Sequence, residues 1–552
     1  MYESLKEIGG LGSIEEADYF GFSSWYNFGF YEADFGWGKP IWVSSIGSSG
    51  SVFMNLVILA DTRLGDGIEA WVTLDEQDMA RLEFNPELLT FASLDPTKTM
   101  KMEVGIVSKE QVKPSSPTPS YLRTFKFSLL DQLIPAPYGP VILFYPINDS
   151  SNLSNIPKRL ELLKKSSSEI LTLYYPLAGK IKDDLCIDCN DEGAYFVEAQ
   201  VNVCLSEFLS QPDLLLLHKF LPCELILKES YVGTYVTNIQ ASFFKCGGIA
   251  IALCIAHKIL DGIAFSTFLK AWAKMARGSY EVVSVYPNSD ATNLFPTNDL
   301  WLRDLSMAMF GSSLKKGKSV TRRFVFHASA IATLKVQATS SCVQHPRHVE
   351  VVSAFIWKHA MAASRENNGF QKPSILTHVV NPRRKLEPPL PEYSTGNLLW
   401  IAGARCRGND ESGLQGLVCK IRSGISKING DFVKKLRAEK RKSVIYESLK
   451  EIGGLESNEE LDCFGFNSWC NFGFYEVDFG WGKPIWVSSI GTSDSVFSNL
   501  IILNDTRLGD GIEAWVTIDE QDMARLECNP ELLAFAPLDP SPLMVGHSIA
   551  NL

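Results

Sequence analysis

The sequence predicts an α/β fold built in two halves, and three observations support this prediction. The chain has 552 residues, which is long for one ordinary domain and sufficient for two large ones. From Met102 onward, strand-like and helix-like segments alternate along the sequence. Residues 285–320 are rich in Pro, Ser, Asn and Lys and lack a regular apolar pattern, so we expect a linker between the halves there.

The elements of the first half follow from their apolar patterns, taken in order. Residues Gly139–Tyr145 are β-branched and aromatic, which is typical of a strand. Residues Ile156–Thr172 carry apolar side chains at helical spacing, and Ala194–Val203 alternate as a strand does. Residues Gly247–Ala256 are almost uninterruptedly apolar, which favours a central strand buried on both faces. Residues Ala264–Ala276 are predicted to form an amphipathic helix.

Composition and charge exclude several classes of function. Hydrophobic residues make up 45% and charged residues 21% of the chain, as in ordinary globular proteins. The net charge is −11, from 52 basic and 63 acidic residues, and binding to nucleic acid requires a basic surface instead. No apolar run approaches the roughly 18–20 residues that span a bilayer, and the first residues lack the pattern of a secretory signal. We therefore expect a cytoplasmic protein with neither nucleic acid nor membrane as a partner.

The cysteines fit that compartment. The chain has 12 cysteines, scattered from Cys186 to Cys528 without a dense framework, so we expect reduced thiols. Cys186 and Cys189 form the only C-x-x-C pair, and a zinc site needs a second pair of ligands at suitable spacing. The sequence therefore predicts no metal site.

A long internal repeat accounts for part of the length. Residues Tyr2–Pro96 and Tyr446–Pro540 align without a gap at an offset of 444, and 16 of the 95 positions differ. Solenoid repeats are shorter, more diverged and adjacent, so this repeat indicates a recent duplication or two neighbouring genes joined. The alternative is a true N-terminal domain with its own role. We predict the following division: an orphan duplicate at 1–99, the first half at 102–300, a linker at 301–322 and the second half at 323–552.

The first copy is predicted to be structurally incomplete. Residues Pro40–Ser45, Ser51–Ala60 and Ile68–Leu74 are strand-like, and Asp75 can cap a short helix. So few strands with large apolar faces need a partner sheet to be stable. The C-terminal copy has such a partner in the preceding 200 residues, whereas the N-terminal copy has no such predecessor.

His257 is the histidine whose position suggests chemistry. It follows the apolar strand and precedes a short turn, in the order His257-Lys-Ile-Leu-Asp261-Gly262. Strand ends that open onto a crevice are where α/β proteins place reactive groups. A neutral imidazole there can take a proton from an alcohol or amine that attacks an acyl donor, an effect of about 10²–10⁴ in rate. Asp261 can either bond the imidazole or turn away and brace the loop; a purely structural histidine is the alternative.

A second motif lies near the C-terminus. In Asp478-Phe-Gly-Trp-Gly482, two glycines around a tryptophan indicate special backbone angles in a tight loop. Together, and in this order, H-x-x-x-D-G and D-F-G-W-G resemble the plant BAHD family of acyl-CoA-dependent acyltransferases, and most closely its vinorine synthase-like O-acetyltransferases. The resemblance covers residues 102–552. It implies a two-domain chloramphenicol-acetyltransferase-like fold with mixed sheets and an inter-domain channel, here preceded by a partial repeat.

The resemblance also implies a mechanism. His257 would be the general base in a ternary complex, moving an acyl group, by subgroup an acetyl group, from acyl-CoA to a hydroxyl or amine of a plant specialised metabolite such as an alkaloid. Hydroxycinnamoyl and benzoyl donors are the alternatives. No tightly bound cofactor is expected, acyl-CoA being a co-substrate, and relatives are usually monomers. Asp261, beside Gly262, would pair with Arg383 instead of the histidine. The residues that would keep the shape of the site are Asp478, Gly480, Trp481 and Gly482.

Two further assignments follow from the resemblance. Asn467 and Trp469, which flank Ser468, match the positions that help hold the tetrahedral oxyanion in relatives. Lys318, Arg322 and Arg323 belong to the one basic cluster of this acidic chain and match the crossover that relatives use for CoA phosphates; a solvated loop is the alternative.

Two other interpretations compete with the acyltransferase. One is a catalytically impaired scaffold or decoy of the same fold, caused by the fused duplicate. The other is a peptide-condensation domain, whose related motif has two histidines, but Ala256 stands at the first of these positions.

Overall fold

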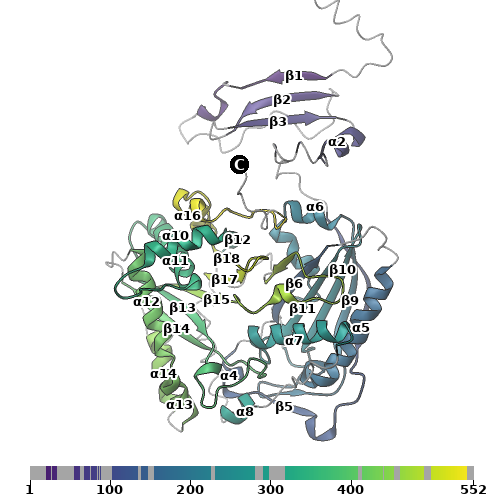
Figure 1. Cartoon of the computed structure of the whole chain (residues 1–552), viewed down its shortest axis with the longest axis vertical. Coiled ribbons are helices and arrows are strands. Elements are labelled where there is room, and N and C mark those ends of the chain that lie inside the picture. The colour runs from purple at the N-terminus through teal and green to yellow at the C-terminus, as the bar shows by residue number, and fades with distance from the viewer. Residues whose placement is uncertain are drawn as a thin grey trace, which may run out of the picture. The chain divides into compact units, whose positions relative to one another are not determined.

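The computed structural model divides the chain into two compact units, Met1–Thr99 (unit 1) and Met100–Leu552 (unit 2). In unit 1 the structure describes residues 20–26, 28–33, 55–62, 67–74, 76–83, 85, 88 and 92. In unit 2 it describes residues 102–134, 138–146, 155–225, 231–279, 290–297, 318–407, 413–438, 441–452, 461–489 and 499–543. Figure 1 shows the elements of both units.

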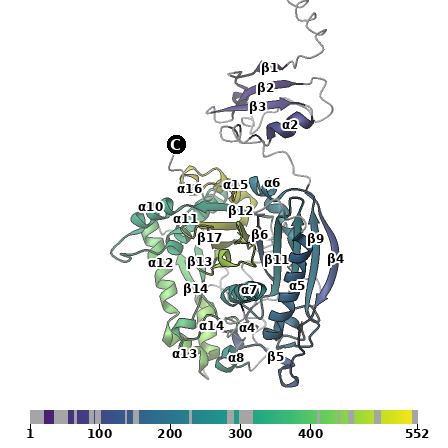
Figure 2. The ribbon, with the colours of Figure 1, turned by 45° about the vertical axis from the view of Figure 1, so that its right-hand side comes forward.

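The first half of unit 2 is built on a mixed sheet with a buried centre. In spatial order its described strands are β16 (Trp486–Ser488), β6 (Tyr138–Tyr145), β11 (Ile249–Ala256), β10 (Thr237–Phe244), β9 (Ala194–Val201) and β4 (Val104–Val112). Every residue of β10 and β11 is buried, and for β11 the apolar run predicted this. Helix α5 (Ile156–Leu173) lies along this sheet and packs on α7 (Gly262–Ala276), where Trp272 Nε1 donates to Ser166 Oγ at 3.0 Å (Figure 2).

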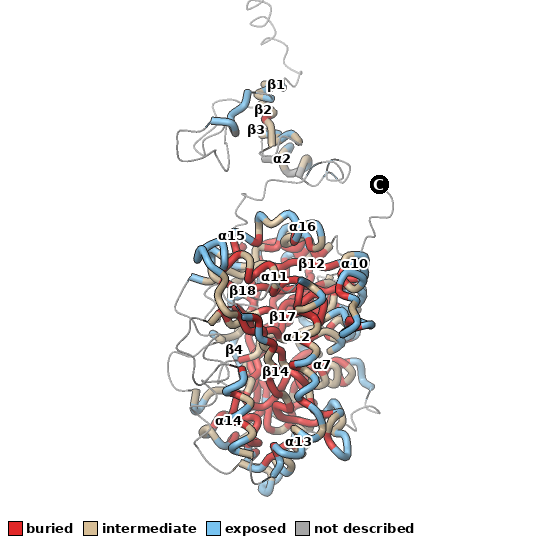
Figure 3. The backbone as a smooth tube through the Cα atoms, turned by 90° about the vertical axis from the view of Figure 1, so that its left-hand side faces the viewer, coloured by how far each residue is buried: buried red, intermediate tan, exposed pale blue. Residues whose placement is uncertain are grey.

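The second half is built on another mixed sheet. Its described strands, in spatial order, are β12 (Ser319–Phe326), β18 (Ile512–Asp519), β17 (Leu500–Asp505), β15 (Asp462–Ser468), β13 (Ser374–Val380) and β14 (Trp400–Cys406). The helices α10 (Ala328–Ala338), α11 (His348–Asn368) and α12 (Leu414–Lys427) lie on its outer side (Figure 1). Trp357 of α11 and Phe464 and Phe466 of β15 belong to the core between them. Figure 3 shows the buried residues concentrated along these packed elements.

Shorter elements complete unit 2. A small sheet has the order β5 (Thr124–Lys126), β8 (Cys186–Asp188) and β7 (Lys180–Ile181). The remaining α-helices are α4 (Leu129–Gln132), α6 (Leu205–Ser210), α8 (Asp290–Leu294), α13 (Gly430–Arg437), α14 (Arg441–Glu451), α15 (Glu520–Glu527) and α16 (Pro530–Phe535). The 3₁₀ helices are η3 (Ser120–Leu122), η5 (Tyr175–Ala178), η6 (Leu214–Phe220), η9 (Arg383–Lys385) and η10 (Phe474–Glu476).

A crossover strand ties the two halves together. β16 follows the D-F-G-W-G segment yet pairs with β6 in the first sheet, in the register Trp486↔Phe144. The Trp486 ring is fully buried, stacks on Phe144 at 5.2 Å between centroids and on Trp515 of β18 at 5.7 Å. A boundary at residue 323 therefore does not separate the two sheets completely, because residues 486–488 complete the sheet of the first half.

The linker prediction requires two corrections. Residues 319–322 were expected to end the linker but form the start of β12, because their alternation with β-branched Val320 and Thr321 suits pairing with β18. Residues 290–294 form the short helix α8 instead of irregular chain. Residues 301–317 lie outside the described residues.

Unit 1 repeats the pairing of the C-terminal copy. Its strands are β1 (Gly21–Ser24), β2 (Leu56–Asp61) and β3 (Ile68–Thr73), and the helix α2 (Glu76–Glu83) follows them. A 3₁₀ helix, η2 (Phe30–Glu32), lies between β1 and β2. β1 is parallel to β2 in the register Gly21↔Leu56, and β15 is parallel to β17 in the register Gly465↔Leu500, which is the same pair at an offset of 444. The predicted strand Pro40–Ser45 lies outside the described residues.

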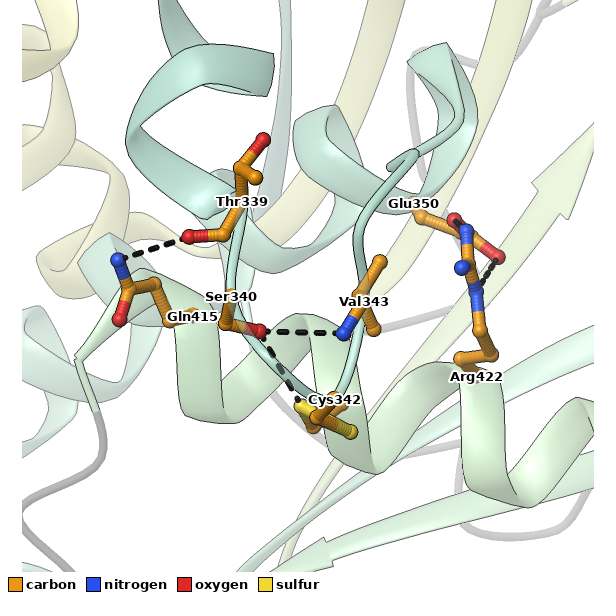
Figure 4. Close-up of a disulfide and its surroundings, with 8 residues drawn as sticks. Thr339, Ser340, Cys342, Val343, Glu350, Gln415 and Arg422 are labelled. Carbon is orange, nitrogen blue, oxygen red and sulfur yellow. Dashed lines mark hydrogen bonds and ion pairs between the residues drawn. A yellow bond between two sulfur atoms is a disulfide. The ribbon is translucent and has the colours of Figure 1, made fainter.

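The expectation of reduced thiols is wrong for one pair. Cys342, in the loop between α10 and α11, forms a disulfide with Cys419 of α12 (Figure 4). The fold places their Cα atoms 6.1 Å apart, which is within disulfide range although 77 residues separate them. The other ten cysteines are outside disulfides.

The described part of the chain contains neither a helix suited to crossing a membrane nor a cluster of side chains suited to a metal ion. No helix in it combines the length and the apolar composition needed to cross a membrane. No group of three or more His, Cys, Asp or Glu side chains in it is arranged to hold a metal ion.

His359 of α11 provides a test of the packing between the second sheet and its outer helices. Its side chain is buried in α11 against Phe355, and burial lowers its pKa to about 4; nearby Glu531 opposes this shift and Lys358 adds to it. Between pH 4 and an unfolded value near 6.5, the unfolded chain binds a proton that the folded chain does not. Stability should therefore fall as the pH drops through this window, by up to about 1.4 kcal/mol per pH unit.

We expect His359→Phe to remove that part of the slope in urea denaturation measured from pH 7 to pH 4. His345→Gln, at an exposed position, is the control and should keep it. Equal slopes in the wild type and His359→Phe would contradict the assignment.

Candidate active site

His257 lies directly after β11, at the edge where the strand meets α7. The turn from His257 to Asp261 is short because Asp261 caps α7, its Oδ1 accepting a hydrogen bond from Ala264 N at 2.9 Å. The imidazole is half-buried, and its Cδ2 lies 3.9 Å from where a Cβ on Gly139 would stand. Gly139 of β6 therefore leaves space beside the ring that a larger residue would fill.

Asp261 faces away from His257. Its Oδ2 accepts from Arg383 Nη1 at 2.6 Å and from Leu398 N at 3.0 Å. Oδ1 thus has its partner in α7, and Oδ2 has its partners in the second half. Of the two roles left open by the sequence, Asp261 takes the one that braces the loop, and the expected pairing with Arg383 is present.

Arg383 organises the segment that approaches His257. Its side chain is fully buried in η9, and its Nη2 donates to the carbonyl oxygen of Ser394 at 3.0 Å and of Gly396 at 3.4 Å. Leu260 forms an isolated parallel bridge with Gly396. The turn after His257 and residues 394–398 are therefore held against each other across the two halves.

Asn397 is the functional candidate that the sequence did not reveal. Its Oδ1 lies 3.1 Å from His257 Nδ1, while its Nδ2 donates to His257 O at 2.7 Å and to Asp131 Oδ1 at 2.9 Å. Because Nδ2 faces two oxygens, Oδ1 must face the imidazole and accept from it. The proton of a neutral His257 then lies on Nδ1, which leaves Nε2 with a free lone pair.

Asp131 supports Asn397 from the other side. Its Oδ1 also accepts from Asn397 N at 2.6 Å, and its Oδ2 accepts from Ser128 N and Oγ, both at 2.7 Å. Burial raises the pKa of the Asp131 carboxyl, and the hydrogen bonds from Ser128 and Asn397 oppose that rise. The sequence signal was available, because Ser128 and Asp131 form a capping box at α4.

Gly396 is required by this geometry. Its φ is +109°, which residues with a Cβ rarely adopt, and a Cβ there would meet Ala291 Cβ at 3.0 Å and Asp131 Oδ1 at 3.5 Å. The close approach of the backbone to Asp131 is what allows Asn397 N to reach the carboxylate.

The D-F-G-W-G segment is a folded loop away from His257. Asp478 Oδ1 accepts from Gly480 N at 2.7 Å and from Gly482 N at 3.0 Å, and both glycines have φ above +100°. Asp478 Oδ2 lies 3.5 Å from Nη1 of Arg277, which follows the C-terminal end of α7. This contact lies at the opposite end of α7 from the turn after His257, and the 15 residues of α7 span about 22 Å at about 1.5 Å per residue.

The tryptophan of this loop packs on the first half. Trp481 stacks on Phe479 at 5.6 Å, meets Tyr145 of β6 edge-on at 6.2 Å, and lies under the Arg159 guanidinium at 5.6 Å. These contacts fix the chain just before the crossover strand β16. The loop therefore positions elements of the site and does not itself reach the histidine.

Asn467 and Trp469 lie at the end of β15. Asn467 is half-buried and Trp469 is buried. The backbone N–H of Trp469 donates to Leu503 O at 2.7 Å. The chain after Trp469 abuts the start of α7, because a Cβ on Gly262 would stand 2.5 Å from the Phe472 ring. The end of β15 thus leads to the turn that follows His257.

The expected CoA-phosphate cluster is not a single exposed surface. Arg323 is fully buried; its guanidinium donates to Glu513 Oε2 at 3.1 Å and to Pro540 O and lies against Trp486 at 5.2 Å. This residue holds the sheets together and is unavailable to a phosphate, so its assignment is corrected. The strand register is the reason, since it places Arg323 opposite Trp515 inside the sheet.

The other two cations of that cluster are accessible but paired. Arg322 Nε lies 2.5 Å from Glu527 Oε1, and Lys318 Nζ lies 2.9 Å from Glu520 Oε1. Lys318 is largely exposed. A phosphate would have to compete with both carboxylates.

Comparisons with known proteins agree on one family. The model of the Transferase family matches residues 7–89 and 102–533. The chain is 45% identical over 454 residues to the epi-neemfruitin B 7-O-acetyltransferase of Melia azedarach, covering 80% of this chain and 100% of that protein. It is 46% identical over 460 residues to the limonoid 7-O-acetyltransferase of Citrus sinensis, with the same coverage.

Solved structures share the fold. Vinorine synthase superposes with a TM-score of 0.67 at 34% identity, covering 79% of this chain and 98% of that one. The complex of F. sporotrichioides TRI101 with coenzyme A and T-2 superposes with a TM-score of 0.61 at 18% identity, covering 75% and 99%. The predicted chloramphenicol-acetyltransferase-like α/β fold with mixed sheets is confirmed.

The buried pair of Asp261 and Arg383 predicts a large effect on stability. Arg383→Ala leaves a buried carboxylate and several carbonyl groups without their donor, so the free energy of unfolding should fall by about 3–5 kcal/mol. Urea denaturation at pH 7 measures the change. Arg384→Ala is the matched control, because the Arg384 side chain is exposed and forms its ion pair with the exposed Glu392. This variant should change the free energy of unfolding by less than about 1 kcal/mol. Similar losses in the two variants would contradict the role given to Arg383.

Proposed function

The chain belongs to the BAHD family of acyl-CoA-dependent acyltransferases, and on that premise we propose that it acetylates a hydroxyl of a plant specialised metabolite with His257 as general base. As a family member it is an acyl-CoA-dependent O-acyltransferase. The proposal rests on the hydrogen bonds between the Asn397 amide and His257, because the bond to Nδ1 leaves Nε2 as the basic atom of the ring.

In the proposed reaction, Nε2 of His257 first takes up a proton and later releases it. Nε2 takes the proton of the acceptor hydroxyl as its oxygen attacks the thioester carbon of acyl-CoA, both substrates being bound together. The tetrahedral intermediate then collapses, the carbon–sulfur bond breaks, and the proton on Nε2 passes to the departing thiolate of CoA. No covalent acyl-enzyme is needed, and acyl-CoA is consumed as a co-substrate.

Two parts of the site support this step. The imidazolium that forms after proton transfer keeps its Nδ1–H bond to Asn397 Oδ1, so the ring does not turn during the reaction. We assign the developing oxyanion to the Asn467 amide, because the end of β15 leads to the turn after His257 and an amide N–H is a suitable donor. Asp261 and the D-F-G-W-G loop act by positioning.

The relatives suggest the acceptor. The relative at 46% identity is named as a limonoid 7-O-acetyltransferase and the one at 45% as an epi-neemfruitin B 7-O-acetyltransferase. Akuammiline synthase 2 of Alstonia scholaris is 38% identical. We therefore propose a limonoid-class alcohol as acceptor and acetyl-CoA as donor. A cytoplasmic location is part of the same proposal.

His257→Ala tests the base directly. Loss of the proton acceptor should lower kcat for acetyl transfer by about 10²–10⁴ while the protein stays folded. Turnover is measured as release of free CoA across a panel of limonoid alcohols, with thermal denaturation as the check on folding. His345→Ala, at an exposed position, should keep full activity. A folded His257→Ala variant with unchanged turnover would refute the mechanism.

Asn397→Ala tests the positioning of the base. Without the amide the imidazole can adopt either tautomer, so kcat should fall by about tenfold or more while KM for acetyl-CoA stays nearly constant. The control is Asn367→Ala, whose amide donates to Asp522 on an exposed surface. A rise in KM with kcat preserved would show that Asn397 serves binding instead.

A further inference from the structure

Gly139 is a glycine inside a strand whose backbone does not require one. Apart from its chain neighbours, a Cβ built on it would lie nearest to Ile255 O at 3.8 Å and His257 Cδ2 at 3.9 Å, which are ordinary van der Waals distances, and its φ lies outside the left-handed region. Gly403 of β14 differs, because a Cβ there would stand 2.8 Å from Ile452 Cγ2. A strand glycine costs conformational entropy and contributes no packing. The space that Gly139 leaves is therefore the feature to explain.

That space lies beside the basic edge of the His257 ring. Cδ2 is bonded to Nε2, which keeps the free lone pair, so a side chain at residue 139 would stand next to the atom that takes the proton. The opposite edge of the ring carries Nδ1 and is occupied by Asn397 of the second half, with Oδ1 at 3.1 Å. A molecule that approaches Nε2 therefore has Asn397 on one side of the imidazole and the open position at Gly139 on the other.

The sheet is least covered at the same place. Within the described residues, β16 pairs with residues 142–144 of β6, and no strand pairs with Gly139 or Pro140 on that side. Pro140 has no N–H to donate, as is usual where a strand edge is free. Gly139, Pro140 and His257 are half-buried, whereas the other residues of β6 and all of β11 are buried. Exposure in these two strands is therefore confined to the end beside His257.

We propose that Gly139 determines which alcohols reach His257, by leaving room for the second carbon substituent of a secondary ring alcohol. This role rests on the proposed function, because it names the acceptor class of that site. The carbon that bears the hydroxyl has one carbon substituent in a primary alcohol and two in a secondary alcohol. When the hydroxyl points at Nε2, one substituent extends away from the imidazole. The second takes the open position at Gly139, because Asn397 occupies the other side.

Gly139 acts on specificity and takes no part in proton transfer. It has no side chain, and the tautomer of His257 is held from the opposite edge by Asn397. A methyl group at residue 139 would occupy the room of one substituent carbon. One methylene more or less in an apolar pocket changes kcat/KM by about 10–200-fold, so even alanine should discriminate between the two kinds of alcohol.

Gly139→Ala and Gly139→Val test this role in the full chain. Two alcohols with one ring skeleton are compared, with acetyl-CoA as donor: one has its hydroxyl on a ring carbon, the other on a methylene attached to that carbon. The ratio of kcat/KM for the secondary alcohol to that for the primary alcohol should fall about tenfold or more in Gly139→Ala, and further in Gly139→Val. Gly105→Val in the outer strand β4, where a Cβ would meet Gln200 O at 4.0 Å, is the control and should keep the wild-type ratio. An unchanged ratio in Gly139→Val, or an equal loss for both alcohols, would overturn the proposal.

A second measurement needs no turnover and separates the space at Gly139 from the proposed function. Diethyl pyrocarbonate carbethoxylates accessible neutral histidine nitrogens, and peptide mass spectrometry follows the rate at each histidine. Gly139→Val should slow the reaction of His257 severalfold, whereas the exposed His345 should react at the wild-type rate. Slower labelling of His257 in a protein that transfers no acetyl group would refute the proposed function and still support the space at Gly139. An unchanged labelling rate at His257 would refute the role of Gly139.

Discussion

The buried ion pair between Asp261 and Arg383 is the interaction on which the site depends. A carboxylate and a guanidinium removed from water are costly unless hydrogen-bond partners replace the lost water. Here Asp261 accepts from Ala264, Leu398 and Arg383, and the terminal nitrogens of Arg383 also donate to the carbonyl groups that precede and follow Asn397. Of the Arg383 guanidinium, Nε has no hydrogen-bond partner within the described residues. One pair thus joins α7 of the first half to residues 394–398 of the second.

The histidine is oriented as a consequence of that junction. The segment held by Arg383 delivers Asn397 to the side of His257, and the buried Asp131 fixes the amide from behind. The aspartate of the motif, although four residues from the histidine, does not orient it. An amide performs the task that a carboxylate performs in a catalytic triad, which is to hold the ring in one tautomer.

Much of this arrangement was predictable from the sequence, and the failures have physical causes. The strand ending at Ala256 and the helix after Gly262 follow from local apolar pattern, which is why they agree closely with β11 and α7. Asn397 was missed because its role arises from a contact across 140 residues. Arg323 was misassigned because a basic cluster in sequence does not reveal strand register, and register places this residue inside the sheet.

The central claim is that Asn397 keeps the proton of neutral His257 on Nδ1. The most direct measurement is the ¹⁵N NMR spectrum of the protein labelled at histidine nitrogens, recorded above pH 8, with the His257 signals identified by their loss in His257→Ala. The account predicts a protonated Nδ1 and an unprotonated Nε2, with the preference lost in Asn397→Ala. A proton on Nε2 in the wild type would contradict it, because that atom could then not accept the proton of the substrate.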